Sequence, residues 1–283
     1  MNGWSGAAFF DALTFSAGHN AAVVAAGAAL LGAAAGSAGV FLFLRKRALL
    51  SDAVAHATLP GVALAFIFMA SIGGDGRSLP GLLIGAAVTA ALGLAAVSWM
   101  TRRTRLGEDA AIGAVLSVFY GLGVVLLTVI QTLGVGKPAG LETFLLGATA
   151  GMLYAEALLI AVAAALALGV VAVLRRPLAV SAFDPGYAAS IGVDIRRVDL
   201  ALMALVTAVV VIGLKIVGLI MVIALLIIPP VAARFWTERS DRMIWIAAVV
   251  GALSGVLGAA ASAAAPSAPT GPLIVLICFA FFA

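Results

Sequence analysis

The chain has 283 residues, of which 64% are hydrophobic and only 10% are charged, and its net charge is +4. An average soluble domain is about half apolar and about a quarter charged, so a soluble fold of this size could not cover so much apolar surface. The composition therefore excludes a soluble enzyme, a soluble nucleic-acid-binding protein and a disordered chain, and it indicates a polytopic membrane protein.

The apolar residues lie in long continuous runs and do not alternate as they would in the strands of a membrane barrel. A bilayer core needs about 20 apolar residues per helix, so we expect an all-α fold, a polytopic transmembrane bundle of about eight to nine helices. The predicted spans lie near 21–44, 49–72, 80–100, 110–133, 152–174, 199–214, 216–233, 243–264 and 271–283. Residues 141–150 are compatible with a short interfacial helix, and residues 1–283 are expected to form one membrane domain.

Small residues recur at four-residue spacing inside these runs. Such pairs let helix backbones approach closely, so they predict tight helix packing and say nothing about a substrate. The pairs are Gly32/Gly36, Gly147/Gly151 and Gly251/Gly255.

The basic residues are distributed unevenly between the predicted loops. Cytoplasmic loops carry an excess of Lys and Arg, so the loops that hold most of the 16 basic residues are expected to face the cytoplasm, with the N-terminus outside. The positive balance then reflects topology and does not indicate a nucleic-acid partner. These loops hold Arg45, Lys46, Arg47, Arg102, Arg103, Arg105, Arg175, Arg176, Arg196, Arg197, Arg234, Arg239 and Arg242.

Two polar residues, Asp52 and His56, lie inside the second predicted span. At about 1.5 Å per residue, His56 is roughly 13 Å beyond Arg47, close to the middle of the membrane. An aspartate inside a span costs about 2.5–3.5 kcal/mol on insertion scales, which makes it a candidate functional residue. Positions i and i+4 share one helix face, so the carboxylate and the imidazole could bind one Mn²⁺, Fe²⁺ or Zn²⁺ ion.

Two ligands are too few for a tight metal site. A second copy of the chain, or a paralogue, related by a two-fold axis would supply two more. Two simpler interpretations stay open on the residues alone: Asp52 and His56 pair only with each other, or Asp52 caps its helix.

Three residues are predicted to kink helices and so to take part in gating. Pro60 and Gly61 follow His56 in the same span, and Pro229 lies in the span at 216–233. Proline and glycine bend helices and free backbone carbonyl groups.

The predicted cytoplasmic loop at about 177–198 contains the signals of a short helix. Asp184 suits the N-cap, Pro185 suits the first helical position, and Gly192 suits the stop, so a helix is expected from Pro185 to about Ile191.

The apolar residues of this short helix are spaced by four. Phe183, Tyr187 and Ile191 would form a knob for a soluble partner, although the same pattern would suit a helix that lies on lipid. The chain has no phosphate-binding loop, because the Gly-Lys at 136–137 lacks the required spacing and the following Ser or Thr. If ATP drives the protein, a separate subunit must bind it.

Five segments, in the same order along the chain, resemble the signatures of the membrane permeases of manganese, zinc and iron ABC importers. They are SDxxxHAxLPGVA at 51–63, EDAAIG at 108–113, FDP…A…IG at 183–192, VG…ALLIIP at 217–229 and PTGP at 269–272. The stretch AGLExFLxG at 139–147 looks most like the manganese and iron branch.

The resemblance implies a fold like that of type II ABC importer permeases and a role as a transport subunit that is not itself an enzyme. It implies a dimer with a second permease or a paralogue in the bacterial cytoplasmic membrane. The other implied partners are a cytoplasmic ATPase dimer, a periplasmic or lipid-anchored metal-binding protein, and membrane lipid. No permanently bound cofactor is implied, since Mn²⁺, Zn²⁺ or Fe²⁺ would be the transported ion.

Carried over by position, the resemblance implies that Asp52 and His56 coordinate the metal inside the membrane. It also implies that the segment at 183–192 docks on the ATPase. The residues expected to couple to the ATPase are Phe183, Asp184, Pro185, Tyr187, Ala188 and Gly192. Two positions depart from the family pattern, namely Ala148, where many relatives have a polar residue, and Pro230, which follows Pro229.

Two other functions are compatible with parts of the sequence. A proton-coupled secondary carrier for metals would use Asp52 and His56 as a proton relay and would need no ATPase. An ABC permease for siderophores or cobalamin would have a similar coupling loop, but such a bulky ligand does not require an Asp–His pair inside the membrane.

Overall fold

The structure is a computed structural model that describes residues 6–14, 16, 18–74, 76, 78–132, 154–265 and 269–283. All regular elements in these ranges are helices, which confirms the all-α prediction. They are α1 (Gly6–Leu13), α2 (His19–Leu44), α3 (Leu49–Ser71), α4 (Leu79–Arg103), α5 (Glu108–Thr132), α7 (Tyr154–Phe183), α8 (Pro185–Ser190), α9 (Ile195–Val217), α10 (Leu219–Trp236), α11 (Ser240–Ala264) and α12 (Thr270–Ala280). Among these, α2–α5, α7 and α9–α11 make 8 helices that are long and apolar enough to cross a membrane.

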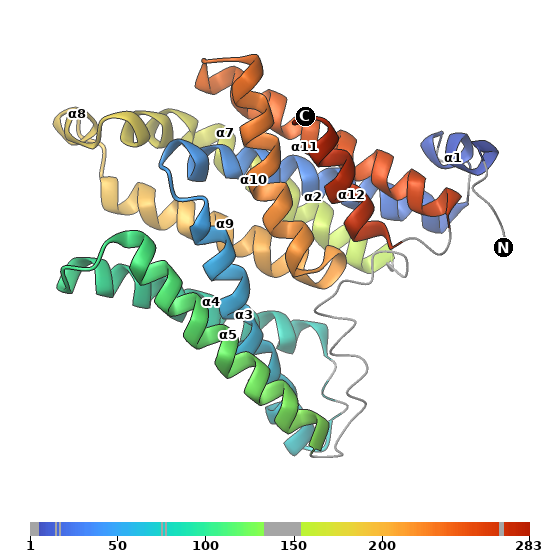
Figure 1. Cartoon of the computed structure of the whole chain (residues 1–283), viewed down its shortest axis with the longest axis horizontal. Coiled ribbons are helices and arrows are strands. Elements are labelled where there is room, and N and C mark those ends of the chain that lie inside the picture. The colour runs from blue at the N-terminus through green and yellow to red at the C-terminus, as the bar shows by residue number, and fades with distance from the viewer. Residues whose placement is uncertain are drawn as a thin grey trace.

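The helices form two groups that meet at α9 (Figure 1). In one group α2 packs against α7, α10 and α11, and in the other α3 packs against α4 and α5. α9 contacts α2, α7 and α10 of the first group and α3 and α4 of the second. The short α8 lies at one end of the bundle, and α1 lies near the opposite end (Figure 1).

Several of the arginine-rich segments that the charge pattern assigns to one side of the membrane meet at the end of the bundle that carries α8. Ion pairs there connect the turn after α2 to α5 and α9, and connect α7 to the start of α11. The pairs are Arg45–Asp199, Arg47–Glu108 and Arg175–Asp241. We call this end of the bundle the basic end.

α7 extends beyond the predicted span at 152–174 and ends only at Phe183. The prediction places Arg175 and Arg176 in a loop, but they lie within the helix, because arginine is a good helix former and its charge marks only the edge of the bilayer. Pro177 is also inside α7, since one missing backbone donor bends a helix without necessarily ending it. The segment at 177–198 is therefore mostly helical.

The predicted spans imply a break between α9 and α10 near Lys215. In the structure the break lies at Gly218. α9 continues to Val217, and Gly218 has a φ of 81°, a backbone conformation that glycine adopts without strain. The prediction relies on the charge at residue 215, but one lysine does not end a helix.

The ends of the chain also differ from the predicted spans. α12 has 11 residues and is shorter than the about 20 that a membrane span needs. α1 is a helix that the hydropathy pattern does not predict. The predicted interfacial helix at 141–150 and the pair Gly147/Gly151 lie outside the described residues.

Glycines allow helix backbones to approach closely, as the spacing of Gly32/Gly36 and Gly251/Gly255 predicts. A Cβ atom on Gly32 of α2 would overlap the carbonyl oxygen of Gly251 of α11, and a Cβ on Gly251 would overlap that of Gly32. Gly61 of α3 and Gly85 of α4 face each other in the same way. The second crossing fixes α4 against the helix that carries Asp52 and His56.

Candidate metal site and the basic end

Asp52 and His56 lie on one face of α3, as their spacing predicts. Asp52 is in the first turn of the helix, and its Oδ1 atom lies 3.2 Å from Nε2 of His56. The side chains are 32% and 21% exposed, respectively. A carboxylate oxygen and an imidazole nitrogen at this separation are close enough to bind the same metal ion after small side-chain rotations.

The His56 ring is held from the side by α5. The Tyr120 ring stands edge-on to it, with the centroids 5.1 Å apart and an interplanar angle of 84°. The Nδ1 atom of His56 is buried and has no hydrogen-bond partner within the described part of the chain. The nitrogen beside the carboxylate is Nε2, 3.2 Å from Asp52 Oδ1, and a carboxylate with an imidazole is a donor set that suits a divalent transition metal ion.

The described residues contain no group of three or more His, Cys, Asp or Glu side chains that could hold a metal ion. Within the described ranges, Asp52 and His56 are therefore the two side chains that this candidate site brings together, and their role as metal ligands stays a prediction. A complete coordination sphere needs ligands from a second chain, the backbone or water.

Pro60 leaves the backbone carbonyl oxygen of His56 without its helical hydrogen-bond donor. Pro60 lies inside α3, and because proline has no N–H, the carbonyl group of His56 lacks its usual helical donor four residues on. α3 nevertheless continues to Ser71, and Gly123 of α5 packs directly against Leu59 and Pro60. The predicted kink and gating role of Pro60 and Gly61 stays a prediction.

Pro229 and Pro230 are both buried within α10, which continues to Trp236. A Cβ atom on Gly36 of α2 would lie 3.3 Å from Cβ of Pro229, so this part of α10 packs closely on α2. The unusual Pro230 therefore does not end the helix, and the gating role of Pro229 stays a prediction.

The short helix predicted at 185–191 is present as α8. Asp184 caps it, with Oδ1 accepting a hydrogen bond of 2.9 Å from the backbone N–H of Tyr187, and Pro185 opens the first turn. The helix ends at Ser190, and Gly192 has a φ of 84°, as the predicted stop requires.

α8 presents apolar side chains outward from the basic end. Phe183, Tyr187 and Ile191 are 69%, 58% and 52% exposed, whereas Ala188 is fully buried. Ala188 also accepts a hydrogen bond from the N–H of Val193, which closes the turn before α9. The four-residue spacing thus places three apolar side chains on the surface, and their docking on a partner stays a prediction.

A cluster of ion pairs lies beneath α8 that the sequence does not predict. Arg45 pairs with Asp199 of α9 and donates a hydrogen bond of 2.7 Å from Nη2 to the Ser181 hydroxyl group of α7. Arg47 pairs with Glu108 of α5 at 2.9 Å and lies 3.8 Å from Asp199. We call these five residues the basic-end cluster.

The Arg45 side chain is only 7% exposed. Burial lowers the pKa of its guanidinium group from the ordinary value, the charge of Arg47 acts in the same direction, and Glu108 opposes the change. An arginine keeps its proton even so. The cluster thus holds a buried charge where the turn that leads into α3 meets α5, α7 and α9, so it connects the helices that flank α8 to the helix of Asp52 and His56.

A family model described as the ABC 3 transport family matches residues 19–283 of the chain. The chain is 42% identical over 248 residues to the manganese transport system membrane protein MntC of Bacillus subtilis, an alignment that covers 87% of this chain and 56% of that protein. It is 38% identical over 234 residues to the zinc transport system membrane protein TroC of Treponema pallidum, with 82% of this chain and 76% of that protein covered. The chain therefore spans little more than half the length of that MntC protein.

Two solved structures have the same fold. PsaBC from Streptococcus pneumoniae, in complex with Fab, aligns with a TM-score of 0.81 and 29% identity over 98% of this chain and 93% of that chain. A metal-chelate type ABC transporter in an inward-facing conformation aligns with a TM-score of 0.72 and 20% identity over 93% of this chain and 84% of that chain. The second likeness concerns the fold alone.

Proposed function

Because the chain belongs to the ABC 3 transport family, we propose that it is the membrane permease of an ATP-driven importer of divalent transition metal ions. The observation that carries the proposal is the contact of 3.2 Å between Asp52 and His56 inside a membrane-spanning helix. Manganese is the first candidate ion, because the protein named for manganese transport is 42% identical to this chain. Zinc is second and iron third, after the names of relatives that are 38% and 30% identical.

The proposed pathway lies between two permease chains, either two copies of this chain or this chain and a paralogue. Asp52 and His56 from each chain hold the ion transiently. A site with few ligands binds the ion weakly enough to release it, and transport requires this release. The basic end faces the cytoplasm of the bacterial cell, which places the N-terminus outside.

Two partners complete the proposed importer. A periplasmic or lipid-anchored protein delivers the ion at the outer end of the bundle. A pair of cytoplasmic ATPases docks on α8, and the basic-end cluster transmits their movement to α3. Hydrolysis belongs to the ATPases, and the chain itself is a transport subunit.

Uptake of radioactive ⁵⁴Mn²⁺ tests this function directly. Two strains that lack their own manganese importers would be compared. One expresses the permease with its binding protein and the active ATPase, and the other has an ATPase whose catalytic glutamate is replaced by glutamine. We expect accumulation only with the active ATPase, and competition by unlabelled Zn²⁺ and Fe²⁺ then ranks the ions. Accumulation that persists with the inactive ATPase but stops with a protonophore would establish a proton-coupled carrier instead.

Replacing Phe183 and Tyr187 by alanine is expected to uncouple the permease from its ATPase. Both side chains are more than half exposed, so their loss should leave the bundle intact while it removes the apolar contact area of the knob. Copurification of the ATPase with the Phe183→Ala/Tyr187→Ala permease should fall at least about tenfold. Phe68→Ala is the matched control, because Phe68 is also exposed, at 66%, but lies near the end of α3 that is far from α8. Unchanged copurification of the double variant would contradict the docking role.

A further inference from the structure

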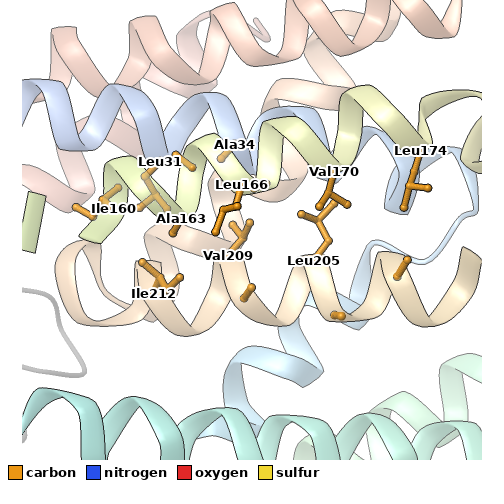
Figure 2. A pocket seen from close by; sticks show the side chains of 15 residues that line it. Leu31, Ala34, Ile160, Ala163, Leu166, Val170, Leu174, Leu205, Val209 and Ile212 are labelled. Atoms are coloured by element: carbon orange, nitrogen blue, oxygen red, sulfur yellow. The ribbon is translucent and has the colours of Figure 1, made fainter. Parts of the chain in front are cut away.

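Two cavities lie on either side of α9. One, of about 430 Å³, is formed by α2, α7 and α9, and Figure 2 shows side chains of α7 and α9 that line it from opposite sides. The other, of about 770 Å³, lies between α4 and α9. Both are lined by Ala204, Ala208 and Ile212 of α9. α9 thus presents a narrow ridge of small side chains with a cavity on each flank.

The cavity between α4 and α9 is amphipathic along its length. At the basic end it is lined by Arg102 and Arg196 and by Trp99, which is 63% exposed. Further along α9 the lining is apolar, with the hydroxyl group of Thr207 as an exception, and it reaches Ile212. From Leu200 to Ile212 the helix rises about 18 Å, close to the about 15 Å of one leaflet of hydrocarbon.

The described residues leave two positive charges at the mouth of this cavity without an acidic partner. Glu108 and Asp199 also line it, but they pair with Arg47 and Arg45 in the basic-end cluster. Arg102 and Arg196 are exposed and have no ion pair with any residue in the described ranges. An exposed tryptophan beside unpaired arginines is typical of the level of lipid headgroups.

We propose that the cavities beside α9 bind an anionic glycerophospholipid from the leaflet at the basic end. The phosphate group lies between Arg102 and Arg196, and the acyl chains run along the two sides of the Ala204–Ala208 ridge. The mouth favours a lipid over an apolar protein helix, because Arg102, Arg196 and Trp99 there suit an anionic headgroup at the membrane surface. The apolar walls exclude a soluble anion as the sole occupant. This inference is independent of which ion the permease carries.

Quenching of Trp99 fluorescence by brominated lipids tests the proposal. The full-length permease with Trp4→Phe, Trp236→Phe and Trp245→Phe keeps Trp99 as its one tryptophan. It would be placed in phosphatidylcholine vesicles that contain the same low fraction of brominated phosphatidylglycerol or brominated phosphatidylcholine. We expect a preference of roughly tenfold or more for the phosphatidylglycerol, since each arginine near the phosphate contributes about fivefold. Equal quenching, or no quenching because another protein segment fills the cavity, would overturn the proposal.

Two pairs of variants separate a built site from general surface charge. Arg102→Gln/Arg196→Gln should remove most of the preference for phosphatidylglycerol. Arg103→Gln/Arg176→Gln changes two other exposed arginines that do not line the cavities, and it should leave the preference unchanged. If the second pair lowers the preference as much as the first, the attraction is diffuse and the proposed site does not exist.

The ridge of α9 provides an independent check on the acyl chains. Ala204 is exposed, so Ala204→Phe should fold normally and fill part of both cavities. We expect it to reduce quenching by both brominated lipids in a permease whose thermal stability is unchanged. Quenching equal to that of the unsubstituted chain would show that the acyl chains lie elsewhere.

Discussion

Replacing Asp52 by asparagine is expected to lower metal uptake strongly without reducing the stability of the permease. Even the residues that orient metal ligands are worth about 10–100-fold in affinity or activity, so loss of a ligand charge should lower ⁵⁴Mn²⁺ uptake at least about tenfold. The effect on folding should have the opposite sign, because an aspartate within a membrane span costs about 2.5–3.5 kcal/mol and asparagine carries no charge. His56→Gln should lower uptake in the same way.

This combination distinguishes the metal role from the simpler interpretation that the two side chains only stabilise α3 by pairing. Uptake and equilibrium unfolding in mixed micelles would be measured on the same variants at equal membrane levels. Asp241→Asn is the matched control, since Asp241 is exposed in the first turn of α11 and forms only a surface pair with Arg175. Normal uptake by both the Asp52 and His56 variants would refute the site, and lost stability with normal transport would favour the structural role.

The parts of the structure that depend on local sequence are predictable. The bounds of α2, α3, α4, α5 and α11 lie within three residues of the apolar runs, because those runs are bounded by charged or glycine-rich turns. The pairing of Asp52 with His56 follows from helix geometry alone. The same holds for α8, where the residues at the N-cap and after the C-terminus have strong and distinct preferences.

The parts that depend on tertiary packing are not visible in one sequence. Tyr120 lies 64 positions after His56, and only the packing of α5 on α3 brings their rings together. Asp199 shows the same limit, because a charged residue at the end of a span is normally solvated, and nothing local indicates that it pairs with Arg45. The sequence does offer one signal for these ion pairs. Asp199 and Glu108 lie at the ends of spans next to arginine-rich turns, where acidic residues can neutralise arginines of neighbouring turns.

Replacing Asp199 by alanine is expected to destabilise the permease by about 3 kcal/mol. The variant leaves the guanidinium group of Arg45 buried without its carboxylate, and breaking a buried pair in this way costs about 3–5 kcal/mol. The lower end applies because Asp199 itself is 22% exposed. The neighbouring pair of Arg47 and Glu108 is 27% and 36% exposed, so Glu108→Gln, the matched control, should cost about 0–1 kcal/mol. Equal losses from the two variants would show that burial of Arg45 is not what makes the cluster stable.

A double variant separates the contribution of the cluster to folding from its proposed role in transmission. Arg45→Met/Asp199→Leu removes both charges, and replacing a buried ion pair by apolar residues is often neutral or stabilising by about 1–4 kcal/mol. We expect it to restore the free energy of unfolding but not ATP-driven ⁵⁴Mn²⁺ uptake, because methionine and leucine cannot replace the hydrogen bond to Ser181 and the ion pair that connect α7 and α9 to the turn before α3. If uptake recovers together with stability, the cluster serves only to fold the basic end, and the movement of α8 must reach α3 through the packing of α9 against it.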